Sequence, residues 1–194
     1  MNSSKKQQQR DALRKRMRAL RSSLSNTQLT QAATILKPKV LTALDAINTH
    51  HRLKRVAGYL AFQGEIDVSP IMDELRKQGV GTYVPMLNSE TLRFAKWTHN
   101  TSYTLNRFGI VEPDVPMSEW IGAEELDAVL VPLVAFDGQG NRMGMGGGFY
   151  DKTFSNRKRS PAPPWLIGVA HTQQQTNDVF EDWWDVKPDQ IICA

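Results

Sequence analysis

Residues 128–154 read AVLVPLVAFDGQGNRMGMGGGFYDKTF, and this stretch decides the fold. Its first part is almost entirely apolar, which is typical of a strand that is buried on both faces of a sheet. A glycine-rich turn follows, and residues 150–154 can begin a helix. A strand, a glycine-rich turn and a helix N-terminus bring several backbone N–H groups to one point, where they can bind a phosphate.

The turn has the composition of an anion-binding loop. Four of the five residues 144–148 are glycines, which allow the main chain to approach a ligand closely. Arg142 adds a planar guanidinium that can hold two phosphate oxygens. The loop is not a Walker A motif, because no Gly-Lys-Ser/Thr follows, and Phe149 breaks the G-x-G-x-x-G pattern. A flexible surface turn is the alternative on composition alone.

The remaining segments predict an α/β domain around this strand. Strands are expected at residues 55–62, 81–85, 92–97 (in the sheet or in a hairpin), 126–136, 164–170 and 190–193. Helices are expected at about 7–22, at 25–44 with a bend or break at Pro38, and at 69–78, with a loop at 112–116. A strand, a helix and a strand in succession predict a parallel pair. We therefore predict one layered domain, residues 1–194, of α/β class, in which helices pack on a mostly parallel central sheet.

Length and composition narrow the class of protein. With 194 residues and 40% hydrophobic content, the chain can bury a core of its own. It has no apolar run near the roughly 20 residues that span a bilayer, and its polar, basic start lacks the apolar core of a secretory signal. Cys193 is the only cysteine, which excludes an internal disulfide. These features predict a cytoplasmic protein with no membrane partner.

The positive charge is concentrated near the N-terminus. Residues 5–21 carry eight basic side chains and one acidic one, whereas the rest of the chain carries 16 basic and 19 acidic ones. Such a segment can bind nucleic acid. The body offers no zinc pattern, RNP box or helix-turn-helix signal, so the sequence disfavours a nucleic-acid partner.

As a helix, this basic segment has a defined inner side. An apolar stripe is flanked by an arginine stripe made of Arg10, Arg14, Arg18 and Arg21. Arg10 and Arg14 lie one turn apart and could clamp a polyphosphate. Because neighbouring arginines repel one another, we expect the segment to be mobile when no nucleotide is bound.

Four stretches, in the same order along the chain, carry a resemblance to a known family. They are Arg10-Asp-Ala-Leu-Arg14, YLAFQGEID at 59–67, LVPLVAFDGQGNRMGMGGGFYD at 130–151 and WDVKPD at 184–189. They closely resemble the motifs of the 5-formyltetrahydrofolate cyclo-ligases, also called methenyltetrahydrofolate synthetases. Two positions depart from the pattern. Arg10 replaces a lysine, which preserves charge but not geometry, and Phe149 replaces the commoner tyrosine, which removes a hydroxyl.

The resemblance implies an activity, two ligands and a metal. The family converts 5-formyltetrahydrofolate into 5,10-methenyltetrahydrofolate with ATP and Mg²⁺, releasing ADP and phosphate, through phosphorylation of the formyl oxygen. The resemblance implies a three-layer α/β fold, with a mostly parallel central sheet and helices on both faces, which agrees with the α/β class predicted above. We expect a monomer that acts on a small-molecule substrate, 5-formyltetrahydrofolate, with one or several glutamates attached.

The resemblance also implies the site residues. ATP is expected at Arg10, Arg14, Arg142, Gly144, Met145, Gly146, Gly147, Gly148, Phe149 and Tyr150, with Arg142 and Tyr150 acting in catalysis. The folate is expected at Leu60, Glu65, Met145, Gly146, Gly147, Gly148 and Phe149, and Mg²⁺ at Asp151 and Asp185. A carboxylate such as Glu65 can accept the paired N–H groups of an aminopyrimidinone ring, and aspartates are hard oxygen ligands. Phe62, Met86 and Phe108 could complete the walls of the pocket.

The residues alone leave other interpretations open. Glu65 could be an exposed acid in a turn, and Phe149 and Tyr150 could be ordinary core residues at a helix start. His171, at the end of another strand, is interpreted as structural. Because a fold does not fix a function, a different enzyme acting on sugar phosphates or CoA esters is the main alternative, followed by a nucleic-acid-binding protein that uses the basic helix.

Overall fold

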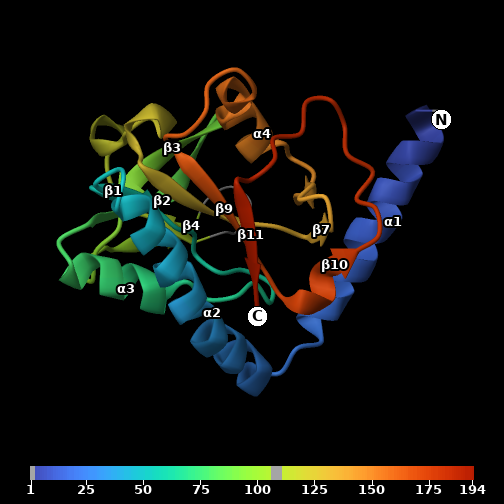
Figure 1. The fold of residues 1–194 in the computed structure, drawn as a ribbon, viewed down its shortest axis with the longest axis horizontal. Coiled ribbons are helices and arrows are strands. Elements are labelled where there is room, and N and C mark those ends of the chain that lie inside the picture. Colours follow the sequence, from blue (N-terminus) through green and yellow to red (C-terminus); the bar gives the residue numbers. More distant parts are fainter. Residues whose placement is uncertain (1–2, 106–110) are drawn as a thin grey trace.

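The computed structural model describes residues 3–105 and 111–194, which form an α/β fold around a six-stranded sheet (Figure 1). The order of strands is β11-β9-β6-β1-β2-β3. Their bounds are Arg55–Ala57 (β1), Gly81–Asn88 (β2), Thr91–Lys96 (β3), Ala128–Pro132 (β6), Trp165–Ala170 (β9) and Gln190–Cys193 (β11). Every neighbouring pair is parallel except the β2–β3 hairpin. The predicted mostly parallel sheet is confirmed.

Helices cover both faces of this sheet. The helices α2 (Asn26–Asn48) and α3 (Ser69–Lys77) pack on one face, where they meet Ala128 and Leu130 of β6. Val129 and Val131 of the same strand point to the other face, where α4 (Phe149–Thr153) packs. Because successive side chains of a strand alternate between faces, a strand covered on both sides is apolar throughout. This explains the apolar run at the start of the quoted stretch.

Two predicted strands are wrong in extent. The expected strand at 126–136 is divided at Leu133 and Val134, whose carbonyl oxygens accept hydrogen bonds from Gln174 Nε2. Its second part, β7 (Ala135–Asp137), joins β8 (Arg142–Met143) and β10 (Gln175–Thr176) in a separate small sheet. The expected strand at 55–62 ends at Ala57. A tight turn follows at residues 62–65, with φ values of 48° at Gln63 and 76° at Gly64.

Smaller differences concern a proline and two loops. The helix α2 continues through Pro38, so the predicted break is wrong. Pro38 lies on the exposed side, where water can bind the carbonyl that lacks an N–H partner, while Leu36 and Val40 are buried against the sheet. Part of the expected loop at 112–116 is a strand, β5 (Val111–Pro113), which pairs with β4 (Tyr103–Leu105). Short 3-10 helices lie at Met117–Glu119, Ala123–Glu125, Ser155–Lys158 and Thr172–Gln174.

The basic N-terminal segment forms α1 (Ser3–Ser22), which lies beside the small sheet rather than on the central one (Figure 1). Leu13 and Met17 of its apolar stripe are buried against Val134, Ala135 and Met143. This packing turns one side of the basic helix toward the loops that follow β6. No helix in the two described ranges is long and apolar enough to cross a membrane.

Asp127 joins the beginnings of β1 and β6. Its carboxylate accepts hydrogen bonds from the backbone N–H groups of Lys54 at 2.7 Å and Arg55 at 2.8 Å. Its other oxygen lies 2.6 Å from His51 Nε2. Burial by itself would raise the pKa of Asp127, but these hydrogen bonds lower the pKa below its ordinary value. The side chain therefore fixes the register in which the two strands start.

We expect Asp127→Asn to lower the free energy of unfolding near neutral pH by about 1–3 kcal/mol, because the charge-assisted hydrogen bonds are lost. A carboxylate with a lowered folded pKa stabilises the fold above its unfolded pKa of about 4. That stabilisation is lost as the pH falls through the folded pKa. Urea unfolding at about pH 7 and about pH 3 measures the free energy of unfolding. The amount by which Asp127→Asn lowers it, relative to the unchanged protein, should be smaller at the acidic pH.

Asp45→Asn, on the exposed side of α2, is the control and should leave the free energy of unfolding unchanged at both pH values. An equal deficit for Asp127→Asn at both pH values would contradict this account.

Candidate active site

The parallel pairing of β1 with β6 brings two predicted site segments together. In this pair Val56 lies opposite Ala128 and Ala57 opposite Val129. Both strands therefore end at the same edge of the sheet, which is where parallel sheets bind ligands. A cavity of about 380 Å³ lies there, between the turn at 62–65 and the glycine-rich loop. The predicted residues that line it are Leu60, Phe62, Glu65, Arg142, Gly144, Met145, Gly147, Gly148, Phe149, Tyr150 and Asp151.

Other predicted residues lie outside the cavity wall. Arg10, Arg14 and Asp185 do not line the cavity: Arg14 contacts the loop at the Gly144 carbonyl, and Arg10 pairs with Asp185. Gly146 faces Arg14, since a Cβ on Gly146 would stand 3.6 Å from Arg14 Nε. Met86 is buried in the sheet and does not line the cavity, so that part of the prediction is wrong. Phe108 lies outside the described residues.

The glycine-rich loop contains backbone conformations that are unfavourable for residues with a side chain. Gly146 and Gly148 have φ values of 112° and 67°. At Gly147, an added Cβ would come within 2.6 Å of the Phe149 ring. Gly148 is also the residue that caps the start of α4. The turn can therefore bend this tightly, with its backbone open to a ligand, only because these positions lack side chains.

Arg142 is a buried link between the loop and the C-terminal segment. Its Nε donates to the Val186 carbonyl at 3.1 Å, and its Nη2 donates to Asp151 Oδ1 at 2.6 Å. The same oxygen accepts the Val186 N–H at 2.9 Å. The remaining nitrogen, Nη1, faces the loop: a Cβ on Gly144 would stand 3.6 Å from it. The guanidinium is thus anchored on one side and turned toward the cavity on the other.

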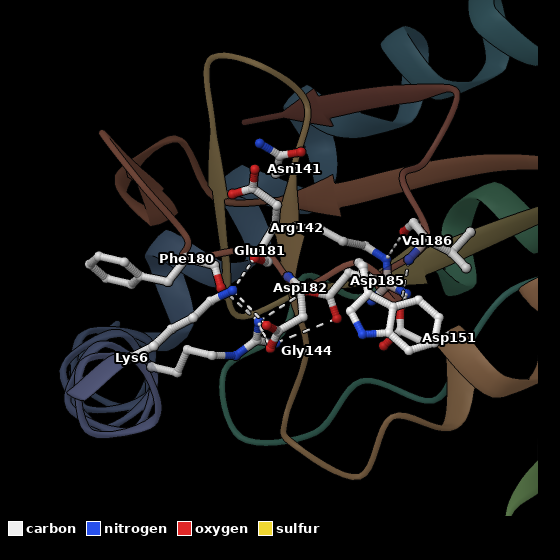
Figure 2. A network of polar contacts seen from close by, with 12 residues as sticks. Lys6, Asn141, Arg142, Gly144, Asp151, Phe180, Glu181, Asp182, Asp185 and Val186 are labelled. Atoms are coloured by element: carbon white, nitrogen blue, oxygen red, sulfur yellow. Dashed lines mark hydrogen bonds and ion pairs between the residues drawn. The ribbon is translucent and has the colours of Figure 1, made fainter. Parts of the chain in front are cut away.

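The arginines of α1 face acidic and carbonyl groups of the body. Arg10 Nη1 donates to Asp182 and to Asp185, both at 3.0 Å, and to the Phe180 carbonyl at 2.7 Å. Arg14 Nε donates to the Gly144 carbonyl at 3.1 Å. Figure 2 follows these contacts from α1 through Asp182 and Asp185 toward Arg142 and Asp151.

These pairs remove the repulsion on which we based the expected mobility of α1. Arg14 also donates to Asp11 at 2.8 Å, and Arg21 pairs with Glu65. Of the four arginines in the predicted stripe, only Arg18 is exposed. Each buried arginine is therefore neutralised by a carboxylate of the chain itself.

Glu65 is largely buried, with 12% of its side chain exposed. Oε2 accepts the Phe62 N–H at 3.1 Å, and Oε1 lies 3.3 Å from Arg21 Nη1. Burial raises the pKa of the Glu65 carboxyl above its ordinary value, while Arg21 and the Phe62 N–H oppose that rise. An exposed turn acid, the alternative left open by the sequence, is excluded. A buried carboxylate on a cavity wall suits recognition of N–H donors.

Tyr150 enters the cavity as a neutral phenol. Burial raises its pKa well above the ordinary value, and the negative charge of Glu65 adds to this, against the opposing effect of Arg142. Its ring stacks on Phe154 with 6.2 Å between centroids, and the Arg142 guanidinium carbon lies 5.9 Å from the ring centroid. A neutral tyrosine can donate a hydrogen bond to an oxygen in the cavity.

Sequence reasoning missed two residues at this site. Asp182 pairs with both Lys6 and Arg10. Its position three residues before Asp185, a predicted site residue, could have indicated that it lies at the site. Arg21 pairs with Glu65, and its helical phase, about two turns beyond Arg14, already pointed it toward the body. Neither signal says which acid meets which base, because the partners lie far apart in the sequence.

Another group of acids lies close to the small sheet. Three carboxylate oxygens, one each from Asp137, Asp178 and Glu181, lie within 4.8 Å of one another. Both oxygens of Asp137 already accept hydrogen bonds from the turn that follows, from the backbone of Gln139 and from the backbone and side chain of Asn141. These contacts explain Asp137 as the residue that shapes the turn before Arg142.

Comparison with known proteins shows the family to which the chain belongs. Residues 5–194 match the model of the 5-formyltetrahydrofolate cyclo-ligase family. The chain belongs to this family. It is similar to the 5-formyltetrahydrofolate cyclo-ligase of Haemophilus influenzae, with 35% identity over 100% of both chains. The enzyme of the same name from Escherichia coli K12 is 33% identical over 93% of this chain and 95% of its own.

Solved structures of family members share the fold. A 5,10-methenyltetrahydrofolate synthetase from Aquifex aeolicus superposes with a TM-score of 0.73 at 28% identity, over 95% of this chain and 89% of its own. One from Mycoplasma pneumoniae superposes with a TM-score of 0.72 at 24% identity, over 94% and 97%. The second likeness concerns the fold alone.

We expect Gly148→Ala to lower the free energy of unfolding by about 1 kcal/mol or more, because an alanine is strained at a left-handed backbone position. Gly138→Ala is the matched control, since a Cβ there meets nothing within 4 Å and its φ is not in the left-handed region. Urea unfolding of both variants tests this. Equal stability of the two would show that the loop does not depend on the backbone shape of Gly148.

Proposed function

We propose that this protein catalyses the ATP-dependent conversion of 5-formyltetrahydrofolate into 5,10-methenyltetrahydrofolate, with release of ADP and phosphate. The observation that carries the proposal is that one cavity has a buried carboxylate, Glu65, on one wall and the glycine-rich loop with Arg142 on the other. Such a cavity can hold a flat, N–H-rich ring against an acid while a phosphate lies on the loop. Membership of the family supports the same reaction.

The reaction needs activation of an amide oxygen. The formyl oxygen attacks the terminal phosphorus of ATP, the bond to the bridging oxygen breaks, and ADP leaves. N10 of the folate then attacks the formyl carbon and loses its proton, and the carbon–oxygen bond breaks to release phosphate. Phosphoryl transfer of this kind is accelerated mainly by positioning and by neutralising charge. Arginine, backbone N–H groups and carboxylates supply those functions without a protein nucleophile.

On the folate side, we assign recognition of the ring to Glu65. Its carboxylate accepts two neighbouring N–H groups of the aminopyrimidinone, while Leu60, Met145 and Phe149 form apolar walls beside it. Tyr150, kept neutral by burial, donates a hydrogen bond toward the reacting oxygen. The placement of the folate ring between these groups and the loop brings the formyl group within reach of a phosphate.

On the nucleotide side, the backbone of residues 144–148 and Nη1 of Arg142 are assigned to the phosphates. Arg14 lies against the same loop through the Gly144 carbonyl, which supports a role for it there. Arg10 is held by Asp182 and Asp185, so we infer that the phosphates take over part of its pairing when ATP binds. The exchange of one anion for another keeps the cation neutralised.

The donor set around the loop fits Mg²⁺. Asp151 and Asp185 are carboxylates, which are the hard oxygen ligands that this ion prefers. Asp151 accepts its hydrogen bonds through Oδ1, and Oδ2 accepts none from the residues described. We infer that Asp151 and Asp185 hold the ion, directly or through water. Bound Mg²⁺ would neutralise the charge that develops on the phosphates.

The direct test follows the absorbance of methenyltetrahydrofolate when the protein meets 5-formyltetrahydrofolate with and without MgATP. Turnover that requires MgATP supports the proposal, and its absence refutes it. A nucleic-acid function is weakened by the burial of Arg10, Arg14 and Arg21.

We expect Arg14→Ala to lower turnover at least about tenfold and to raise the KM for ATP, because one phosphate-facing cation is lost. Arg18→Ala removes an exposed arginine from the same helix and should match the unchanged protein. Steady-state kinetics with each substrate varied in turn measure both effects. If the two variants behave alike, the phosphate role of Arg14 is wrong.

We expect Glu65→Gln to raise the KM for 5-formyltetrahydrofolate more than the KM for ATP, because an amide cannot accept two N–H groups as a carboxylate does. Glu124→Gln, an exposed acid in a 3-10 helix, is the control. Equal changes in both KM values would remove Glu65 from the ring-binding site.

A further inference from the structure

Arg21 is a buried cation that the proposed reaction does not yet use. It lies near the end of α1 and is 1% exposed. Its Nη1 lies 3.3 Å from Glu65 Oε1 and 3.4 Å from the Leu133 carbonyl, and its Nη2 lies 3.9 Å from Met145 Sδ. Its Nε is buried and has no hydrogen-bond partner among the described residues. Each of its neighbours belongs to a segment at the edge of the cavity.

These contacts compensate only weakly for the burial of the Arg21 guanidinium. Removing a guanidinium from water is unfavourable, and distances of this length lie at the outer limit of hydrogen bonding. An apolar side chain of similar volume often stabilises such a position equally well. Stability therefore does not explain why an arginine stands here. The group that needs it is Glu65, a carboxylate that is buried on the wall of the cavity.

The backbone of Arg21 supports the same turn. A Cβ on Gly64 would come within 2.4 Å of the Arg21 carbonyl oxygen, so the turn lies directly on the end of α1. On its other side, His171 Nε2 lies 2.9 Å from the Gly64 carbonyl oxygen. The turn that presents Glu65 is thus held between α1 and the end of β9, and the guanidinium sets the direction of the carboxylate.

We propose that Arg21 is a positioning residue, whose guanidinium holds the Glu65 carboxylate at the cavity wall, negatively charged and turned toward the ligand. This inference rests on the proposed role of Glu65 in binding the folate ring. It assigns to the end of α1 a part in folate recognition, whereas Arg10 and Arg14, earlier in the same helix, are assigned to the nucleotide.

The charges around Glu65 make this role measurable. Burial raises the pKa of Glu65, and Arg21 is the chief opposing influence. Tyr59 and Tyr150, which also face it, have raised pKa values and stay neutral, and burial lowers the pKa of His171. The other nearby charges are Asp67, two residues beyond Glu65, and Arg142, across the cavity. Loss of Arg21 would therefore raise the pKa of Glu65 further and leave more of it protonated near neutral pH.

The test compares Arg21→Met with Arg18→Met, which removes an exposed arginine from the same helix. At about pH 7, Arg21→Met should raise the KM for 5-formyltetrahydrofolate about tenfold and leave the KM for ATP nearly unchanged. As the pH rises, Glu65 should regain its charge and the folate KM should fall back toward that of the unchanged protein. Arg18→Met should show no shift in the profile.

Two further variants separate positioning from a general loss of structure. Arg21→Lys keeps a positive charge and should keep the pH profile of the unchanged protein, even if Arg21→Met folds poorly. Arg21→Met combined with Glu65→Gln should be no worse in folate KM than Glu65→Gln alone, because Arg21 acts through Glu65. Far-UV circular dichroism and urea unfolding confirm that the variants are folded.

The proposal is overturned by additive effects of the two substitutions, by a pH profile that does not move in Arg21→Met, or by equal rises in both KM values. It is also overturned if Arg21→Lys loses the profile of the unchanged protein. These outcomes differ from failure of the proposed function, in which the unchanged protein itself shows no MgATP-dependent turnover.

Discussion

The parallel pairing of β1 with β6 is the constraint on which the site depends. Parallel neighbours end at the same edge of a sheet, so the segments that leave them must share the space beyond that edge. One segment carries Glu65 and the other carries the glycine-rich loop. Asp127 fixes the opposite ends of the two strands through the backbone of Lys54 and Arg55. The cavity therefore follows from strand order more than from the identity of its lining.

Paired opposite charges organise the surroundings of this cavity. Arg10 meets Asp182 and Asp185, Arg142 meets Asp151, and Arg21 meets Glu65. Burying a cation without an anion costs free energy, and each of these pairs avoids that cost. The same pairs join α1, the C-terminal segment and the glycine-rich loop. The helix α1 thus contacts Asp185, one of the two acids assigned to the metal, through Arg10, and the acid assigned to the folate, Glu65, through Arg21 near its end.

Much of this could be predicted from local patterns. The apolar run at 128–136 located the strand region, and the glycines located the tight turn, because both signals are contained in neighbouring residues. The break at Leu133 could not be predicted, since it depends on Gln174, about 40 residues away in the sequence. The partners of Arg10 and Arg21 were missed for the same reason. Helical phase gives the side on which an arginine lies, but the fold decides which carboxylate it meets.

We propose that the turn carrying Glu65 and the glycine-rich loop form two walls of one folate site. Hydrogen–deuterium exchange of the segments at 59–67 and 142–151, with 5-formyltetrahydrofolate as the only added ligand, tests this claim most directly. Saturation with 5-formyltetrahydrofolate should slow exchange in both segments together. Protection of one segment without the other, or of neither, would contradict it.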